Sequence, residues 1–240
     1  MRALTAAVVQ GQDLGELFDI YMAPQPSAAS FVGEPRATGV ARPRGLVHES
    51  GDWHRSVHVW MYTESGMLLL QKRAEGKDTF PGRWDVSVAG HVTSGDSVLA
   101  TALKEVREEL GIAITEVAAA AEEEEASSKG GGGGGGLESL GVVPTMAKGS
   151  SPISGDFLCN EYKNIFLFKL PFGDDVDIKA ELRFEPNEEV ADIRMAHFTE
   201  VKEALLAQLD GTTELDGPFI QRPRHYLNVV FGALAERCSG

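Results

Sequence analysis

The sequence is short of cysteine, of positive charge and of long apolar runs. Two cysteines, Cys159 and Cys238, are too few for a disulfide framework, so a reducing, cytoplasmic location is the expectation, with organellar targeting left open. The 22 basic and 36 acidic residues give a net charge of −14, which argues against broad binding to nucleic acid or to an anionic membrane. No apolar run approaches the roughly 20 residues of a membrane span. An acidic enzyme that holds divalent cations fits these absences better.

An apolar content of 42% in 240 residues is enough for an ordinary packed core. Composition changes most sharply between about 115 and 152, where a run of alanine and glutamate precedes seven consecutive glycines, Gly130 to Gly136. Such a run loses too much backbone entropy on ordering, and it lacks the Lys-Ser/Thr ending of a phosphate loop. We therefore expect an N-terminal extension (1–14) and one domain (15–240) with a flexible insertion at about 115–152. The segment 23–43 is expected to be a loose surface loop.

The periodicity of apolar residues predicts strands mixed with helices. Strands are expected over residues 57–62, 67–72, 85–91, 162–170 and 190–198, and helices over residues 97–110, 200–209 and 224–237. The polar tetrapeptide 63–66 predicts a hairpin turn between the first two strands, and Gly111 is expected to end the first helix. This mixture indicates an α/β sandwich.

The helix predicted over residues 97–110 carries three glutamates on one side. The i, i+3, i+4 spacing of Glu105, Glu108 and Glu109 places them within a sector of roughly 100°. Carboxylates packed this closely need a counter-charge, and hard oxygen donors select Mg²⁺ or Mn²⁺. Taken alone, the pattern is also that of a solvated acidic face. A separate apolar stripe is expected to bury the helix: Leu99, Ala102, Leu103, Val106 and Leu110.

The surroundings of these glutamates form a longer pattern. Gly90 is followed after five residues by Asp96 and after seven more by residues 104–112, KEVREELGI. This spacing resembles the Nudix box, with Asp96 in place of its first Glu and Lys104 in place of its Arg. Lys104 keeps the charge of that arginine but not its two-pronged contact. The resemblance implies the Nudix-type α/β/α sandwich with a mixed β-sheet, and a hydrolase that cleaves a diphosphate linked to another group.

The same resemblance implies roles for individual residues. Glu105, Glu108 and Glu109 would bind Mg²⁺ (or Mn²⁺), and Glu105 is also a candidate base for the attacking water. The carbonyl of Ala89, immediately before Gly90, is a further candidate ligand.

A second resemblance covers residues upstream and downstream of the box. The stretch HRSVHVW (54–60) and the sequence Ala-Gly-His at 89–91 resemble isopentenyl-diphosphate isomerase, a Nudix-fold enzyme in which three histidines and two glutamates hold a metal. By motif, His48, His54 and His91 match the histidines and Glu161 matches one glutamate. Cys159 stands where the other glutamate would be.

Basic and aromatic residues complete the implied pocket. Arg44, Arg73 and Lys77 match residues that grip the substrate diphosphate in that family, although ordinary surface charge is the alternative. Trp84 is expected to line the apolar part of the pocket, or else to belong to the core. The predicted substrate-binding set is Arg44, Arg73, Lys77, Trp84 and Lys104.

Hydrolysis is favoured over isomerisation by one substitution. The isomerases need a cysteine directly before the Gly-His pair, and this sequence has Ala89, whose methyl group transfers no proton. The pattern is also similar to isomerase-like Nudix proteins of plants and green algae, which implies hydrolysis of isopentenyl or dimethylallyl diphosphate to the monophosphate. The expected partner is a small diphosphate, and the family implies a homodimer.

Three alternatives remain open. The first is a Nudix hydrolase of nucleotide-type diphosphates, and the second is an isomerase that uses Glu161 and Cys159 as its acid and base. The third is a non-catalytic module that binds a metabolite.

Overall fold

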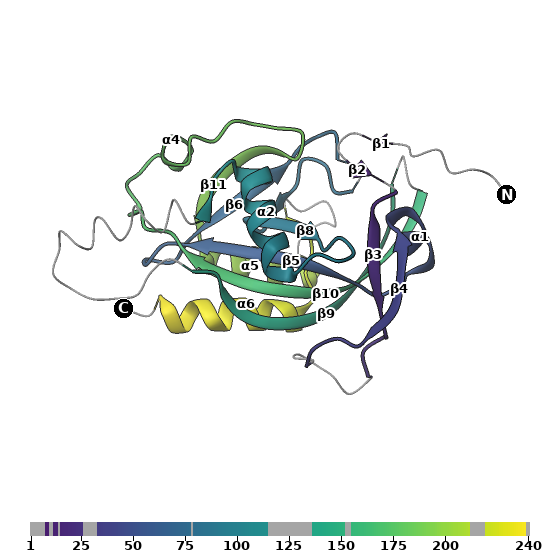
Figure 1. The fold of residues 1–240 in the computed structure, drawn as a ribbon. Coiled ribbons are helices and arrows are strands. Elements are labelled where there is room, and N and C mark those ends of the chain that lie inside the picture. Colours follow the sequence, from purple (N-terminus) through teal and green to yellow (C-terminus); the bar gives the residue numbers. More distant parts are fainter. Residues whose placement is uncertain are drawn as a thin grey trace.

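The computed structural model describes residues 8–9, 12–13, 15–25, 33–77, 79–114, 136–151, 155–211 and 219–238. Its centre is a seven-stranded sheet with the main order β11-β6-β5-β10-β9, in which β8 pairs with β5 and β7 with β6 (Figure 1). β10 runs parallel to β5 and the other pairs are antiparallel, so the sheet is mixed. The strands are β5 (His54–Tyr62), β6 (Met67–Arg73), β7 (Trp84–Asp85), β8 (Val88–His91), β9 (Glu138–Ser151), β10 (Gly155–Lys169) and β11 (Val190–His197).

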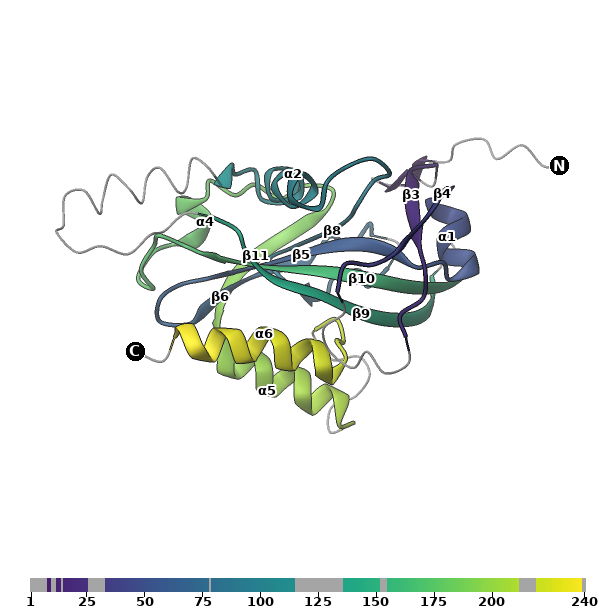
Figure 2. The same cartoon turned by 60° about the horizontal axis from the view of Figure 1, so that its bottom comes forward.

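Helices cover both faces of this sheet. α2 (Val98–Leu110) lies on one face, and α5 (Phe198–Leu209) and α6 (Arg224–Arg237) lie on the other (Figure 2). A short helix, α4 (Ile178–Glu181), precedes β11. The predicted α/β/α sandwich with a mixed sheet is confirmed, and so are the three predicted helices.

Alternation along β5 builds two hydrophobic cores. Val57, Val59 and Met61 pack into the core beneath α2, whereas Trp60 and Tyr62 pack into the core beneath α5 and α6. Successive side chains of a strand point to opposite faces, so one strand supplies both layers. β5 is therefore buried along nearly its whole length, as the apolar run at 57–62 predicts.

Beside one end of the sheet lies a small unit formed by residues that precede β5. It consists of a two-stranded sheet, β3 (Leu17–Tyr21) and β4 (Ala37–Pro43), followed by α1 (Arg44–Ser50). The expected loose loop at 23–43 is wrong for its last seven residues, because these pair with β3. In the expected N-terminal extension, β1 (Val8–Val9) and β2 (Gln12–Asp13) form a further antiparallel pair.

The expected flexible insertion at 115–152 is wrong for its second half. Residues 138–151 form β9, which pairs with β10 from Glu138 opposite Leu167 to Ser151 opposite Gly155. The ladder of backbone hydrogen bonds stabilises a segment whose glycine and serine content disfavours a strand by itself. The glycine run up to residue 135 lies outside the described residues. Because β10 pairs with β9 from Gly155 onwards, it begins seven residues before the predicted start at 162.

The strand predicted over 85–91 is two strands. β7 pairs with β6 and β8 pairs with β5, and Ser87 lies between them. The Ser87 hydroxyl donates to the Leu69 carbonyl and accepts from the Met61 amide, so it links the two neighbouring strands at this break. Among the described helices, none is both long and apolar enough to cross a membrane.

Candidate active site

α2 carries the glutamates to the pocket; Ser97 caps its start, and Gly111 ends it as predicted. The Ser97 hydroxyl accepts from the Ala100 amide at 3.1 Å, and Gly111 ends the helix with a left-handed φ of 72°. The apolar stripe is only partly as predicted, because Leu99 and Leu103 are exposed. The buried residues of α2 include Ala102, Val106 and Leu110, and also Glu109. The buried face of the helix therefore reaches further towards the carboxylates than the sequence predicts.

Glu109 is the most enclosed of the three glutamates. Its Oε2 accepts from the Ala89 amide at 3.0 Å and from Gln71 Nε2 at 3.1 Å. Burial, followed by the neighbouring charge of Glu105, raises the pKa of the Glu109 carboxyl well above its usual range. The sequence predicts the Ala89 carbonyl as a metal ligand. In the structure, the amide of the same residue holds Glu109 by a hydrogen bond.

Glu105 extends against strand β8. Burial and the charge of Glu108 raise the pKa of Glu105 to about 7. A Cβ atom at Gly90 would overlap the Glu105 side chain, so only glycine leaves room for the carboxylate there. The remaining glutamate, Glu108, is half exposed and forms an ion pair with Lys104 at 3.8 Å. Glu105, Glu108 and Glu109 are called the carboxylate group below.

The carboxylate group fits a divalent cation. Two of its members are carboxyls whose pKa is raised because they are buried beside like charge, and a cation between them would remove that cost. Their oxygen atoms are the hard donors that Mg²⁺ and Mn²⁺ prefer. The three glutamates are thus brought together at one wall of the pocket, as predicted.

The pocket is a cavity of about 330 Å³, and basic side chains line it together with the carboxylate group. Arg73 is held by Thr79, with its Nε 3.0 Å from the Thr79 carbonyl oxygen. Lys77 forms an ion pair with Glu189, and Arg44 lies 3.6 Å from a Glu16 oxygen. All three predicted diphosphate-binding cations therefore line the same cavity as the glutamates.

Trp84 does not line this cavity. It lies on the α5/α6 side of the sheet, where the Arg194 guanidinium stacks over its ring at 4.3 Å from the centroid. Trp84 therefore packs against the core, which was the alternative to its predicted place in the pocket. Phe80 and Ile220 are the larger apolar side chains among the residues that line the cavity.

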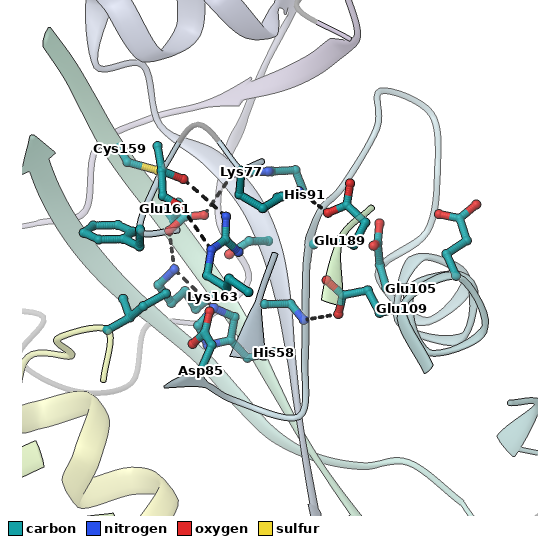
Figure 3. Close-up of a pocket in the computed structure, with 18 of the residues that line it drawn as sticks. His58, Lys77, Asp85, His91, Glu105, Glu109, Cys159, Glu161, Lys163 and Glu189 are labelled. Carbon is teal, nitrogen blue, oxygen red and sulfur yellow. Dashed lines mark hydrogen bonds and ion pairs between the residues drawn. The ribbon is translucent and has the colours of Figure 1, made fainter. Parts of the chain in front are cut away.

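The opposite wall of the pocket is built from β5, β7 and β10 (Figure 3). Glu161 forms an ion pair with Lys163, whose Nζ also lies 3.3 Å from His58 Nε2. His58 Nδ1 is 2.7 Å from the Tyr226 hydroxyl. Lys163 cancels the charge of Glu161, and its proximity keeps the pKa of that carboxyl well below its usual range despite the opposing effect of burial.

Several pocket residues were missed in the sequence. They are Glu189, Lys163, His58 and the buried ion pair of Asp85 with Arg222. Lys163 could have been found, since residues 159, 161 and 163 share one face of a strand. Glu189 lies 112 residues from its partner Lys77, and no local pattern reports such a contact.

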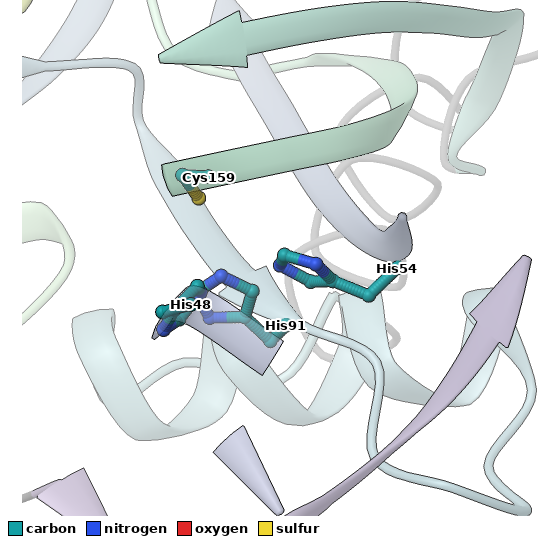
Figure 4. A group of neighbouring side chains, drawn as sticks. All are labelled: His48, His54, His91 and Cys159. Atoms are coloured by element: carbon teal, nitrogen blue, oxygen red, sulfur yellow. The ribbon is translucent and has the colours of Figure 1, made fainter. Parts of the chain in front are cut away.

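A second cluster lies where α1 meets the sheet. His48, His54, His91 and Cys159 come from α1, β5, β8 and β10, and one donor atom of each lies within 4.8 Å of the others (Figure 4). We call these four residues the histidine–cysteine group. Burial lowers the pKa of His48 to about 3 and lowers those of His54 and His91, so all three imidazoles are neutral. Glu161 lies beside this group, with Oε1 3.2 Å from His91 Nε2.

Comparison with known families identifies the fold and the box. A family model described as NUDIX domain matches residues 52–222, well over half of the chain. The chain belongs to the Nudix family. Membership of the family is thereby confirmed, and it supports a divalent cation as the cofactor.

Individual relatives match over shorter stretches. "Nudix hydrolase 3" of Arabidopsis thaliana is 51% identical over 82 residues, which are 34% of this chain and 11% of that protein. An isopentenyl-diphosphate Δ-isomerase of Mycolicibacterium vanbaalenii is 33% identical over 98 residues, 39% of this chain and 54% of that protein. The matched stretches thus span less than two thirds of the length of these relatives.

One solved structure has a similar fold. The crystal structure of DR0079 from Deinococcus radiodurans superposes with a TM-score of 0.51 over 94% of this chain and 100% of that chain. At 17% identity this likeness supports the fold alone.

Proposed function

We propose that the protein hydrolyses an isoprenoid diphosphate, isopentenyl or dimethylallyl diphosphate, to the monophosphate and phosphate. One observation carries the proposal: the carboxylate group and the cations Arg73 and Lys77 line a single cavity of about 330 Å³. A diphosphate needs both, because its charge must be neutralised by a metal on one side and by basic side chains on the other. Mg²⁺ held by the carboxylate group would supply Lewis acidity and an activated water.

Each part of the chain has a separable task in this reaction. Arg73 and Lys77 would hold the diphosphate against the glutamates. A hydrogen bond to Thr79 fixes Arg73 at the end of β6, and Lys77 lies on the loop that follows this strand. Glu105 faces the cavity beside Gly90, which suits it to accept the proton of an attacking water. Glu109 is held by the Ala89 amide and by Gln71, so its oxygen would orient the metal.

The choice of hydrolysis over isomerisation rests on Ala89. Ala89 lines the cavity next to Gly90, and its methyl group transfers no proton where an isomerase would need a proton donor. Phe80 and Ile220 offer apolar surface for a short hydrocarbon group. The similarity to an isopentenyl-diphosphate isomerase over 98 residues adds support for the isoprenoid part.

A second candidate substrate is a nucleotide-type diphosphate. The wall opposite the carboxylate group is polar, because it is lined by Ser56, His58 and Lys163. Such side chains suit hydroxyl groups and ring nitrogens better than an alkene. The same hydrolytic groups would serve this substrate.

The two candidates are separated by ³¹P NMR on the purified protein with Mg²⁺ and isopentenyl diphosphate. We expect the two coupled phosphorus signals to be replaced by those of a monophosphate and free phosphate, and Glu108→Gln to abolish this change. Glu236→Gln, at an exposed glutamate on α6, is the matched control and should keep full activity.

Other outcomes redirect or overturn the proposal. An intact isoprenoid diphosphate, together with turnover of a nucleotide diphosphate, would select the second candidate. Shifted alkene signals in the ¹H spectrum without phosphate release would establish isomerisation despite Ala89. If the protein turns over no diphosphate, hydrolysis is wrong and the non-catalytic binding module is the remaining alternative.

A further inference from the structure

The last turn of α2 is tied to a distant loop by one side chain. The final carbonyl groups of a helix have no partner within the helix, and the carbonyl of Glu109 is one of them. Asn187, in the loop before β11, donates its Nδ2 to the Glu109 carbonyl oxygen at 3.0 Å, across 78 residues of sequence. Glu109 lines the cavity, so this contact holds the backbone of a pocket residue.

The other end of the Asn187 side chain shapes its own loop. Its Oδ1 accepts from the backbone amides of Glu189 and Val190, both at 2.8 Å. Two backbone donors at one atom identify it as the oxygen, and the nitrogen is therefore the atom that faces Glu109. One side chain thus sets where Glu189 lies relative to the last turn of α2.

Glu189 extends this placement to Lys77. The Glu189 carbonyl oxygen accepts from the Ala74 amide at 3.0 Å, and the Glu189 carboxylate forms the ion pair with Lys77 (Figure 3). The loop that follows β6 is therefore held at its backbone and at its ammonium group. An ammonium has three donors, so one can stay on Glu189 while the others contact phosphate oxygens.

We propose that Asn187 is a positioning residue for diphosphate binding, which sets the place of the Lys77 ammonium relative to the carboxylate group. The path runs from the Glu109 carbonyl to Asn187, on to Glu189 and then to Lys77, and each step is a hydrogen bond or an ion pair. A metal-bound diphosphate must reach the glutamates and Lys77 at once, so an error in their spacing weakens its binding. Asn187 itself does not line the cavity, so it acts through its neighbours. This inference rests on the proposed diphosphate site, although not on hydrolysis there.

Two variants separate the two halves of the Asn187 contact. Asn187→Asp keeps an oxygen for the amides of Glu189 and Val190, but it has no donor for the Glu109 carbonyl. Asn187→Ala loses both halves and adds no charge. A role confined to the turn would therefore spare Asn187→Asp, whereas the proposed link to α2 is lost in both variants.

The test measures, by isothermal titration calorimetry in excess Mg²⁺, how tightly the protein binds methylenediphosphonate, a diphosphate analogue whose bridge cannot be hydrolysed. We expect Asn187→Asp and Asn187→Ala to bind it about 5- to 10-fold more weakly than the wild type, as for the loss of one hydrogen bond. In a Lys77→Met background, Asn187→Asp should cause no further loss, because a residue that acts through Lys77 has no effect once Lys77 is gone. Glu188→Gln, at the exposed neighbouring residue, is the matched control and should bind as the wild type does.

The outcomes separate this inference from the proposed hydrolysis. If Asn187→Asp binds as tightly as the wild type, the inference is wrong and the hydrolysis is unaffected. The same conclusion follows if Asn187→Asp causes equal losses with and without Lys77, since Asn187 would then act by another route. A wild-type protein that does not bind methylenediphosphonate would overturn the inference together with the diphosphate site. Binding without turnover of any diphosphate would contradict the hydrolysis alone.

Discussion

Strand β8 has two different surroundings within three residues. Ala89 donates its amide to Glu109, and Gly90 leaves room for Glu105, so this part of the strand shapes the carboxylate group. The next residue, His91, belongs to the histidine–cysteine group. The carboxylate group therefore meets β8 at Ala89 and Gly90, and the histidine–cysteine group meets it at His91.

Burial acts on both groups and has opposite consequences for them. It raises the pKa of Glu105 to about 7 and lowers the pKa of His48 to about 3, because in each case it disfavours the charged form. A neutral imidazole is already the form that binds a metal, whereas a carboxyl must give up its proton. The imidazoles of the histidine–cysteine group are thus uncharged, while the carboxylate group gains from a counter-charge.

The largest expected effect is a loss of stability beside the histidine–cysteine group. Phe18→Ala removes a fully buried ring that packs with Ile20 and Val47 and stacks on two imidazoles. We expect the free energy of unfolding to fall by about 3 kcal/mol, as for other buried aromatic residues cut back to alanine. Urea unfolding measures this loss.

The matched control for this change is Phe80→Ala, at a side chain that is 37% exposed. It should cost clearly less than Phe18→Ala, because more than a third of the Phe80 side chain is already exposed to water. The folded fraction of Phe18→Ala should retain hydrolysis, since the hydrogen bonds of Glu109 are untouched. Equal losses in both variants would show that the stacked ring does not support the histidine–cysteine group.

The carboxylate group and the histidine–cysteine group also differ in how far the sequence alone predicts them. The three glutamates lie on one helix, and their i, i+3, i+4 spacing reports their shared direction directly. The members of the histidine–cysteine group are spread from residue 48 to residue 159, so only the motif resemblance related them. The strand pattern could have placed Lys163 beside Glu161, but not His58 beside Lys163, because that contact depends on how β10 lies against β5.

The fold was predictable where apolar periodicity is strong, as in α6, whose bounds at 224 and 237 match the prediction. It was not predictable in β9, where glycine, serine and proline hide a strand that exists through its ladder with β10. Backbone hydrogen bonds to a distant partner outweigh local propensity there.

An effect of intermediate size is expected on the carboxylate side. Gly90→Ala would place a methyl group where the Glu105 side chain lies, and the carboxylate must move. A displacement of about 1 Å of a catalytic group costs about 100-fold in rate, so kcat should fall by that factor. Thermal unfolding should change little, because the new methyl group meets only the Glu105 side chain. Gly232→Ala, in α6 with open space around the Cβ position, is the control and should keep full activity.

The smallest expected effect is the stabilisation that Mg²⁺ gives to the protein. A cation at ten times its dissociation constant stabilises the folded state by about 1.4 kcal/mol, which thermal unfolding with and without Mg²⁺ detects. Glu105→Gln should lose this increment, because the amide oxygen carries no charge to compensate, while Cys159→Ser should keep it. In the absence of metal, Glu105→Gln should be at least as stable as the wild type, since it removes a carboxyl buried beside Glu108. If Cys159→Ser abolished the Mg²⁺ increment instead, the two groups would share one cation, and the chemical division at β8 would be wrong.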